Sequence, residues 1–219
     1  MRKILIWSIF FMMGISTQAE LLGHWNFENI KNGVLPDLSG KGNHGVIHGN
    51  PEIVDGISGK ALRFSTNDDY VDFGKPIIPE DDFTVSAWIN CDSVEKQFFL
   101  GQYKYEAAGR LDLAIREGRA RIQIEQIIDS PKLIEPRKWN HIVFTRKAGI
   151  LRIYLNSNMV MEKEHHTRVI RSASLILGKL FVPKRNDFRL CGMIDELKIW
   201  DSGISESEIK NEFKAQAQD

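Results

Sequence analysis

The sequence predicts an all-β protein, a sandwich of two antiparallel sheets with one short helix near the C-terminus. Three observations lead to this prediction. Runs of about five to eight residues alternate between apolar and polar side chains, the two-residue period of a half-buried strand. Clusters of Gly, Pro, Asn and Asp separate these runs, as turns between strands require. Residues 20–219 suffice for one sandwich with a sizeable core.

The N-terminal segment predicts export. Two basic residues precede an uncharged apolar run from Ile4 to Ile15, and small residues follow as far as Ala19. This order is typical of a secretory signal peptide that is cleaved after Ala19. The alternative is a membrane anchor, but the run has only about a dozen residues where a spanning helix needs about 20. We therefore expect residues 1–19 to be a signal peptide and residues 20–219 to act as a secreted, periplasmic or extracellular protein without membrane insertion.

The alternating runs mark the expected strands. The clearest of them, in chain order, are Phe83–Ile89, Leu111–Ile115, Arg121–Glu125 and Leu151–Leu155. Only one helix is expected, over Glu206–Phe213, because Ser205 can cap it and Glu208 stands at the third position of a capping box. Residues from Ala215 onward are expected to fray. No linker or repeat divides the chain after the signal segment, so we expect a single domain.

The charge balance of the chain argues against a nucleic-acid partner. The 29 basic and 29 acidic residues balance, so no electrostatic footprint for nucleic acid is expected.

Cys91 follows one expected strand and Cys191 precedes another, Met193–Trp200. If these strands are neighbours, a disulfide in an exported protein would close a loop of about 100 residues and contribute up to about 4.7 kcal/mol. The alternative is two separate buried thiols.

An ordered series of short motifs runs through the chain. The motifs are Trp25–Glu28, Asp37–Gly45, Gly59–Phe64, Asp69–Val71, Phe83–Ile89, Trp139–Val143, Leu151–Asn156 and Gly192–Trp200. In this order they resemble the laminin-G-like, concanavalin A-like jelly-roll family, and the resemblance extends from Leu22 to Phe213. It implies a two-sheet antiparallel jelly-roll β-sandwich of concanavalin A type with a short C-terminal helix.

The resemblance also implies a structural calcium ion. Relatives often hold one where the first strand, an early loop and the last strand meet. The matching positions here are Glu28, Asn43, Gly45 through its carbonyl, and Asp195. Carboxylate, amide and carbonyl oxygens are the ligands calcium prefers. Many relatives have Asp where this chain has Glu28. The alternative is that Asn43 and Asp195 only hydrogen-bond turns and strand ends.

Catalysis is not expected. Some jelly-roll relatives are glycosidases that resemble one another in a Glu-x-Asp-x-Glu strand, which this sequence lacks. Glu125 and Asp129 could share a strand face but would lie about 13 Å apart, whereas retaining hydrolysis needs carboxylates about 5–5.5 Å apart. There is also no Gly-x-Ser-x-Gly nucleophile motif.

Binding is the expected function, with carbohydrate as the first candidate ligand. Sugar sites combine aromatic rings with amide, carboxylate and guanidinium groups. The candidate ligand residues are Tyr103 and Tyr105 in one loop, with Arg119, Arg121 and Gln123 on one face of a nearby strand. The alternative for this face is a solvated surface without a ligand. The sequence leaves open whether the partner is a glycan or an extracellular protein. The oligomeric state of the protein itself is also open.

Overall fold

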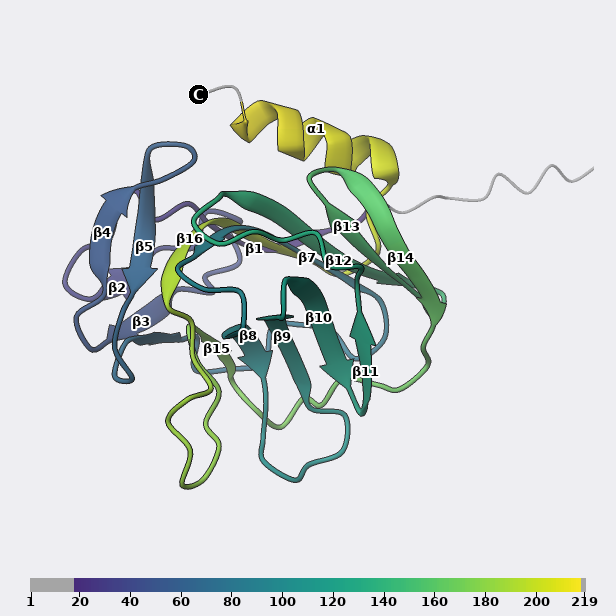
Figure 1. Cartoon of the computed structure of the whole chain (residues 1–219), viewed down its shortest axis with the longest axis horizontal. Coiled ribbons are helices and arrows are strands. Elements are labelled where there is room, and N and C mark those ends of the chain that lie inside the picture. Colours follow the sequence, from purple (N-terminus) through teal and green to yellow (C-terminus); the bar gives the residue numbers. More distant parts are fainter. Residues whose placement is uncertain (1–17, 218–219) are drawn as a thin grey trace, which may run out of the picture.

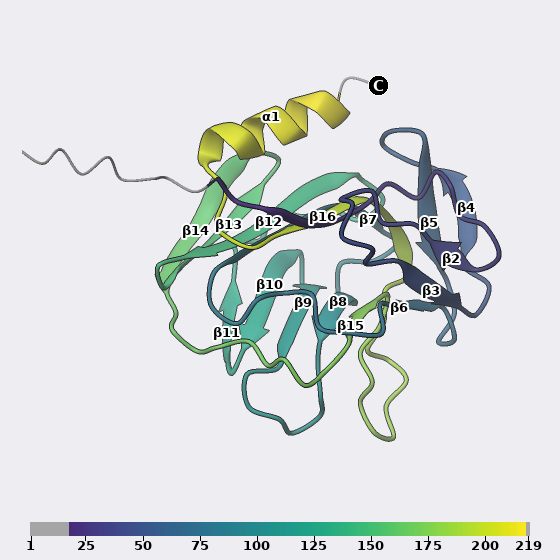
Figure 2. The same cartoon turned by 180° about the vertical axis from the view of Figure 1, so that it is seen from behind.

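A computed structural model of the chain, which describes residues 18–217, shows two antiparallel sheets packed face to face with one helix outside them (Figures 1 and 2). The predicted all-β sandwich with a C-terminal helix is confirmed. The predicted signal peptide lies outside the described residues except for Gln18 and Ala19. No helix within residues 18–217 is both long and apolar enough to cross a bilayer.

Sheet A contains eight strands in the order β14-β13-β12-β7-β16-β5-β4, with β1 also pairing with β16. Their bounds are β1 Leu21–Trp25, β4 Glu52–Asp55, β5 Lys60–Phe64, β7 Phe83–Cys91, β12 Asn140–Lys147, β13 Ile150–Leu155, β14 Asn158–Glu164 and β16 Gly192–Trp200. The last strand of the chain therefore lies in the middle of this sheet, next to the first.

Sheet B also contains eight strands, in the order β11-β10-β9-β8-β15-β6-β3-β2. Their bounds are β2 Val34–Leu35, β3 Gly45–His48, β6 Tyr70–Asp72, β8 Lys96–Gln102, β9 Leu111–Arg116, β10 Arg119–Ile124, β11 Gln126–Asp129 and β15 Leu175–Leu177. Alternation along β10 is as predicted, because Ile122 and Ile124 are buried in the core while Arg121 and Gln123 are only partly buried. One face of sheet B is thus core and the other is outer surface.

The helix α1, Glu206–Gln216, covers the outer face of sheet A (Figures 1 and 2). The predicted capping box of Ser205 and Glu208 is present. The ring of Phe213 stacks on Trp88 of β7 with 5.3 Å between centroids. The outer face of sheet B lies on the side of the sandwich away from α1.

The C-terminal turn of α1 is ordered, in contrast to the prediction of fraying from Ala215. Gln216 is buried, and its Oε1 accepts a hydrogen bond from Trp88 Nε1 at 2.7 Å. Its Nε2 donates to Glu196 Oε2 at 2.9 Å. These two bonds to sheet A hold the helix as far as Gln216, and sequence periodicity did not indicate them.

The predicted disulfide is not present, since Cys91 and Cys191 are both free thiols. Their strands are neighbours, as the prediction required, but Cys91 lies opposite Gly192. Cys191 is therefore one position out of register, and successive side chains of a strand point to opposite faces. Cys91 faces the core while Cys191 is only partly buried.

We expect both cysteines to react with a thiol reagent in denaturant without any reductant, giving two thiols per chain. The offset register holds the two side chains on opposite faces, so no bridge forms without a backbone shift. Mass spectrometry after alkylation measures the number directly. A protein that takes up reagent only after reduction would contradict the observed register.

Candidate functional site

Two loops project from sheet B on the side away from α1 (Figures 1 and 2). One joins β8 to β9 and spans residues 103–110. The other spans residues 178–191 between β15 and β16, and we call it the β15–β16 hairpin because Lys179 pairs with Arg189 and Val182 with Arg185. These loops are the most prominent features of the open side of the sandwich.

The β15–β16 hairpin folds onto the outer face of sheet B. Leu180 forms a buried apolar cluster with Phe98 of β8 and Ala114 of β9. Gly101 of β8 lies directly under Leu180, because a Cβ at this position would collide with the leucine side chain. The ring of Phe188 lies 4.8 Å from that of Phe98. These contacts hold the hairpin against the sheet, so its side chains are presented on a packed base.

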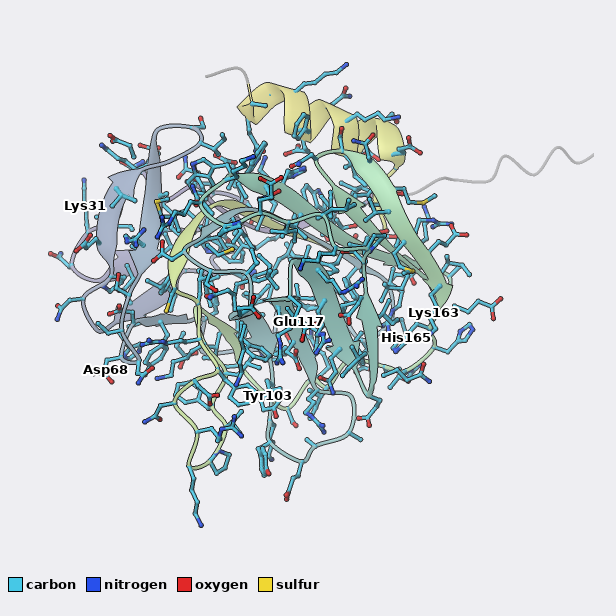
Figure 3. All side chains as sticks on the ribbon, in the orientation of Figure 1. Lys31, Asp68, Tyr103, Glu117, Lys163 and His165 are labelled. Carbon is cyan, nitrogen blue, oxygen red and sulfur yellow. The ribbon has the colours of Figure 1, made fainter. Side chains whose placement is uncertain are left out.

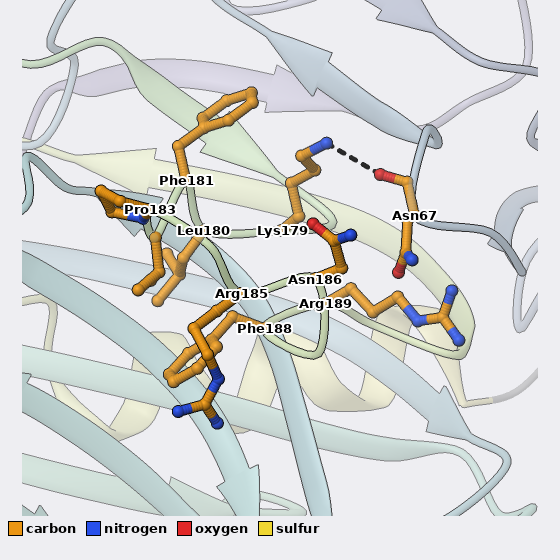
Figure 4. A pocket seen from close by; sticks show the side chains of 10 residues that line it. Asn67, Lys179, Leu180, Phe181, Pro183, Arg185, Asn186, Phe188 and Arg189 are labelled. Carbon is orange, nitrogen blue, oxygen red and sulfur yellow. Dashed lines mark hydrogen bonds between the residues drawn. The ribbon is translucent and has the colours of Figure 1, made fainter.

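Two cavities adjoin the hairpin and share Phe181. The first, of ≈ 280 Å³, is lined by Asn67, Lys179, Leu180, Phe181, Val182, Pro183, Arg185, Asn186, Phe188 and Arg189 (Figure 4). The second, of ≈ 290 Å³, is lined by Asp72, Tyr103, Lys104, Ser172, Ala173, Ser174, Ile176 and Phe181. Phe181 thus stands between two hollows rich in polar groups.

Phe181 belongs to a group of rings on the outer face of sheet B. Its side chain is 49% exposed and meets Tyr70 of β6 edge to face, with 5.2 Å between centroids. Tyr70 in turn stacks on His48 of β3 at 4.3 Å. Lys179 places Nζ 4.6 Å from the Tyr70 ring and 4.7 Å from the Phe181 ring. The neighbouring rings and the cation restrict the orientation of Phe181, while about half of the residue stays exposed.

The polar groups of the first cavity are mostly donors. Lys179 Nζ donates to the carbonyl oxygen of Asn67 at 2.8 Å (Figure 4), and burial lowers the pKa of this lysine. Asn67 and Asn186 add carboxamides, and Arg189 adds a guanidinium. An exposed ring beside amide and cationic donors can hold a ligand that has one apolar face and several oxygen acceptors.

The two predicted tyrosines are placed differently. Tyr103 lines the second cavity, at the base of the β8–β9 loop (Figure 3), and Arg110 lies 5.8 Å from the centre of its ring. Burial raises the pKa of Tyr103. Tyr105 is 47% exposed and lines neither cavity. The structure therefore brings Tyr103, but not Tyr105, to the candidate site.

The predicted strand residues lie on the outer face of β10, further along sheet B. Arg121 forms two bonds of 2.7 Å with the carboxylate of Asp129 on β11, and Arg119 Nη1 donates to the Ser130 carbonyl at 3.1 Å. Gln123 faces the same side, opposite Asp112 of β9. The two arginines thus already have partners within their own sheet.

Asp112, a polar position of β9, was not among the predicted site residues. It is 3% exposed, and no hydrogen bond reaches its Oδ1. Burial raises its pKa to about 7, although the charges of Arg110, Arg121 and Arg116 act in the opposite direction. An unpaired buried carboxyl group of this kind favours the protonated form.

Stability should therefore fall as pH rises through the titration of Asp112. Folding raises its pKa from 3.8 to about 7, so in this interval the folded state holds a proton that the unfolded state releases. Melting temperatures of the wild type and of Asp112→Asn, measured from about pH 5 to about pH 8, test this. The variant is expected to lose less stability than the wild type over the range. Equal losses would contradict a protonated Asp112.

Two of the predicted calcium ligands meet at the turn between β4 and β5. Asp195 is fully buried, and its Oδ2 accepts hydrogen bonds from the backbone N–H groups of Ile57 and Ser58 at 3.1 and 3.2 Å. Glu28 reaches the same turn, where its Oε1 accepts from Lys60 N at 2.6 Å. Burial raises the pKa of Asp195 to about 7.

The other two predicted ligands lie elsewhere. The carbonyl oxygen of Asn43 accepts from Trp25 Nε1 at 2.9 Å, and its amide donates to the Leu22 carbonyl. Gly45 begins β3, where a Cβ would collide with Val71. Glu28 and Asp195 thus contact the same turn, whereas Asn43 and Gly45 contact residues of other segments. Within residues 18–217, no three His, Cys, Asp or Glu side chains gather as a metal site.

The sequence contained a signal for the hairpin that the motif analysis did not use. Residues 181–189 combine two phenylalanines with Pro, Asn, Asp and three basic side chains, and they match none of the recognised motifs. Turn-forming residues together with exposed aromatic and basic residues are typical of a functional loop. The contribution of Asn67 and Tyr70 required the fold, because they are more than 100 residues away from the hairpin.

The comparisons with known proteins agree with this fold. The family model described as the concanavalin A-like lectin/glucanases superfamily, of laminin G type, matches residues 65–210. No curated protein sequence matches the chain.

Three solved structures show the same fold at low sequence identity. Domain 4 of AbnA, a GH43 extracellular arabinanase from Geobacillus stearothermophilus in complex with arabinotriose, has a TM-score of 0.73 and 20% identity over 92% of this chain and 100% of that one. The binding domain of Paraclostridial mosquitocidal protein 1 has a TM-score of 0.71 and 18% identity over 90% of this chain and 52% of its own. The receptor binding domain of botulinum neurotoxin type G has a TM-score of 0.70 and 14% identity, over 90% and 51%.

The chain spans about half the length of the two toxin domains and all of the arabinanase domain. The predicted jelly-roll architecture is confirmed by these likenesses together with the family model.

Proposed function

The chain belongs to the concanavalin A-like lectin/glucanases superfamily, and we propose that within it this protein is a non-catalytic binding module for carbohydrate. The observation that carries the proposal is the exposed ring of Phe181 between two cavities lined by hydroxyl, amide and cationic groups. A sugar ring offers an apolar C–H face for stacking and hydroxyl groups for hydrogen bonds. Domain 4 of the arabinanase, a structure of the same fold, was solved with a bound oligosaccharide, which is consistent with this proposal.

Absence of catalysis is part of the proposal. The carboxylates on the outer face of β9–β11 are engaged or buried. Asp129 is held by Arg121, Glu125 accepts a hydrogen bond from Gly109 N at 2.7 Å, and Asp112 is buried. None of these groups resembles the exposed pair of carboxylates that glycoside hydrolysis uses.

A protein partner is the second candidate, because an apolar strip continues from the rings across sheet B. Val34 of β2 and Val46 of β3 lie opposite each other and are 40% and 52% exposed. Val46 lies next to Asp72 of β6 in the same sheet, close to the aromatic group of Tyr70 and Phe181. Exposed apolar surface of this kind is found at protein interfaces as well as at ligand sites.

The first test is a glycan array with the purified protein, followed by calorimetry on any saccharide that binds. The carbohydrate proposal expects binding of at least one saccharide class and loss of that binding when Phe181 is replaced. A silent array with a correctly folded protein would reject it and favour the protein partner.

Export belongs to the same proposal. Cleavage after Ala19 would leave every described strand intact, because β1 begins at Leu21. The backbone nitrogen of Glu20 lies 2.7 Å from Asp201 Oδ1, so the ammonium group created by cleavage would have a carboxylate partner. Mass determination of the protein from the culture medium or periplasm tests the cleavage site.

Calcium at the β4–β5 turn is the last part of the proposal. Glu28 and Asp195 would provide carboxylate oxygens there, and backbone carbonyls and water would complete the shell. Ion at about 100 times its dissociation constant stabilises by about 2.7 kcal/mol, so chelation is expected to lower the melting temperature by about 5–10 °C. In Glu28→Gln this shift should shrink or vanish, whereas Glu52→Gln, a solvent-exposed control on β4, should keep it. An identical melting temperature with and without chelator would reject the calcium site.

A further inference from the structure

The cavities around the β15–β16 hairpin carry an excess of positive charge. A further hollow of ≈ 490 Å³ adjoins the first cavity and shares Asn67, Asn186 and Arg189 with it. The cations that line the two are Lys96, Lys179, Arg185 and Arg189, and Asp187 is the one carboxylate among the described lining residues. Because the whole chain is electrically balanced, this excess is a local feature of the hairpin.

Most of these cations are already engaged. Arg185 forms two bonds of 2.9 Å with Asp187, and Lys96 pairs with the same carboxylate. These partners hold the pKa of Asp187 well below its usual range. Lys179 donates to Asn67 and lies over the rings of Tyr70 and Phe181. Asp187 is therefore shared by Arg185 and Lys96, and the charges of Asp68 and Asp69, outside the lining, act on Lys179.

Arg189 is the exception. Among the contacts within residues 18–217, no hydrogen bond or ion pair reaches its guanidinium, although its backbone carbonyl accepts from Phe98 N at 3.0 Å. The side chain is partly buried and lines the cavity together with the carboxamides of Asn67 and Asn186 (Figure 4). A planar guanidinium binds a carboxylate or a sulfate through two parallel hydrogen bonds, and flanking carboxamides can donate to further oxygens.

The same cavity contains a surface for a ring. Phe181 and Arg189 both line it, and its volume of ≈ 280 Å³ is just below the range for small-ligand pockets, about 300–1,000 Å³. A cavity of this size suits a single substituted ring better than a length of polymer. Apolar and cationic recognition elements are therefore combined in one small site.

We propose that this site selects saccharides that carry a carboxylate or a sulfate ester, with the anionic group on Arg189 and the sugar ring against Phe181. This inference rests on the proposed carbohydrate-binding function and adds the charge class of the ligand.

Calorimetry with matched probes tests it. The probes are oligogalacturonate and its methyl ester, and a sulfated galactan oligosaccharide and its desulfated form. At low salt, at least one anionic probe is expected to bind about tenfold or more tightly than its neutral form, because charge-assisted bonds are stronger than neutral ones. Added salt should reduce this preference. Preference for the uronate identifies a carboxylate ligand, and preference for the galactan identifies a sulfate ligand.

Two variants test whether Arg189 causes the preference for an anionic probe. Arg189→Gln is expected to remove the preference without loss of fold, since within residues 18–217 no hydrogen bond or ion pair reaches the guanidinium. Arg185→Gln, in the same cavity, is expected to keep it, because that guanidinium is already paired with Asp187. Equal binding of charged and neutral probes would overturn this inference and leave the carbohydrate proposal intact. Binding of none of the four probes, together with a silent glycan array, would overturn both.

Discussion

Replacing Phe181 with alanine is expected to weaken saccharide binding by about 30-fold or more. An aromatic residue at the centre of a binding site typically contributes about 2 kcal/mol or more, which corresponds to this factor. The fold should tolerate the change, because the ring is 49% exposed and its main contact is the edge-to-face pair with Tyr70. We expect a loss of about 1 kcal/mol of stability at most. Calorimetry and thermal melting of the same preparation measure both quantities.

Tyr105→Ala is the matched control. Tyr105 is 47% exposed, close to the value for Phe181, and lies on the other projecting loop, but it lines neither cavity. Its removal should leave the affinity within about a factor of two. If Tyr105→Ala weakened binding as much as Phe181→Ala, the ligand would extend over the β8–β9 loop, as the sequence analysis predicted.

The largest expected loss of stability follows from Trp88→Ala. Trp88 is 3% exposed between sheet A and α1, stacks on Phe213 and donates to Gln216. Truncation of a buried tryptophan costs about 3–5 kcal/mol, and here it also leaves the Gln216 side chain without its donor. For a domain of this size, each kcal/mol lowers the melting temperature by about 2–4 °C. We expect a decrease of about 6–20 °C.

The control for Trp88→Ala is Leu133→Ala, on a residue that is 54% exposed. It should change stability by no more than about 0.5 kcal/mol. Saccharide affinity at a temperature where both variants are folded should be unchanged, since α1 lies on the opposite side of the sandwich from the hairpin (Figure 1). A Trp88→Ala variant that melts with the wild type would mean that α1 is not docked on sheet A as described.

Elements with a strong local pattern were predictable from the sequence. The strand Phe83–Ile89 was recognised from its alternation, and the start of α1 from the capping box of Ser205 and Glu208. Local pattern could not show which residues of other elements would contact these strands and the helix. The hydrogen bond from Trp88 to Gln216, for example, joins residues 128 positions apart and has no local signal in the sequence.

The register between neighbouring strands and the packing of loops on the sheets could not be predicted from the sequence either. The predicted disulfide depended on the strands of Cys91 and Cys191 being neighbours, which they are, but a shift of one residue decides whether two thiols face each other. The β15–β16 hairpin lacks periodicity, and its place depends on Leu180 meeting Gly101 and Phe98. Tyr103 was predicted as a ligand residue from the sequence, whereas Phe181, Arg189 and Asp112 were recognised only in the fold.

The central claim is that the protein binds a saccharide at the β15–β16 hairpin. An NMR titration of the isotope-labelled protein, with the tightest-binding saccharide from the array, tests it most directly. The largest amide shifts are expected in residues 179–189, with further shifts at Asn67, Tyr70 and Tyr103. Saturable binding whose shifts are confined to another surface, such as the β4–β5 turn or β10–β11, would contradict it.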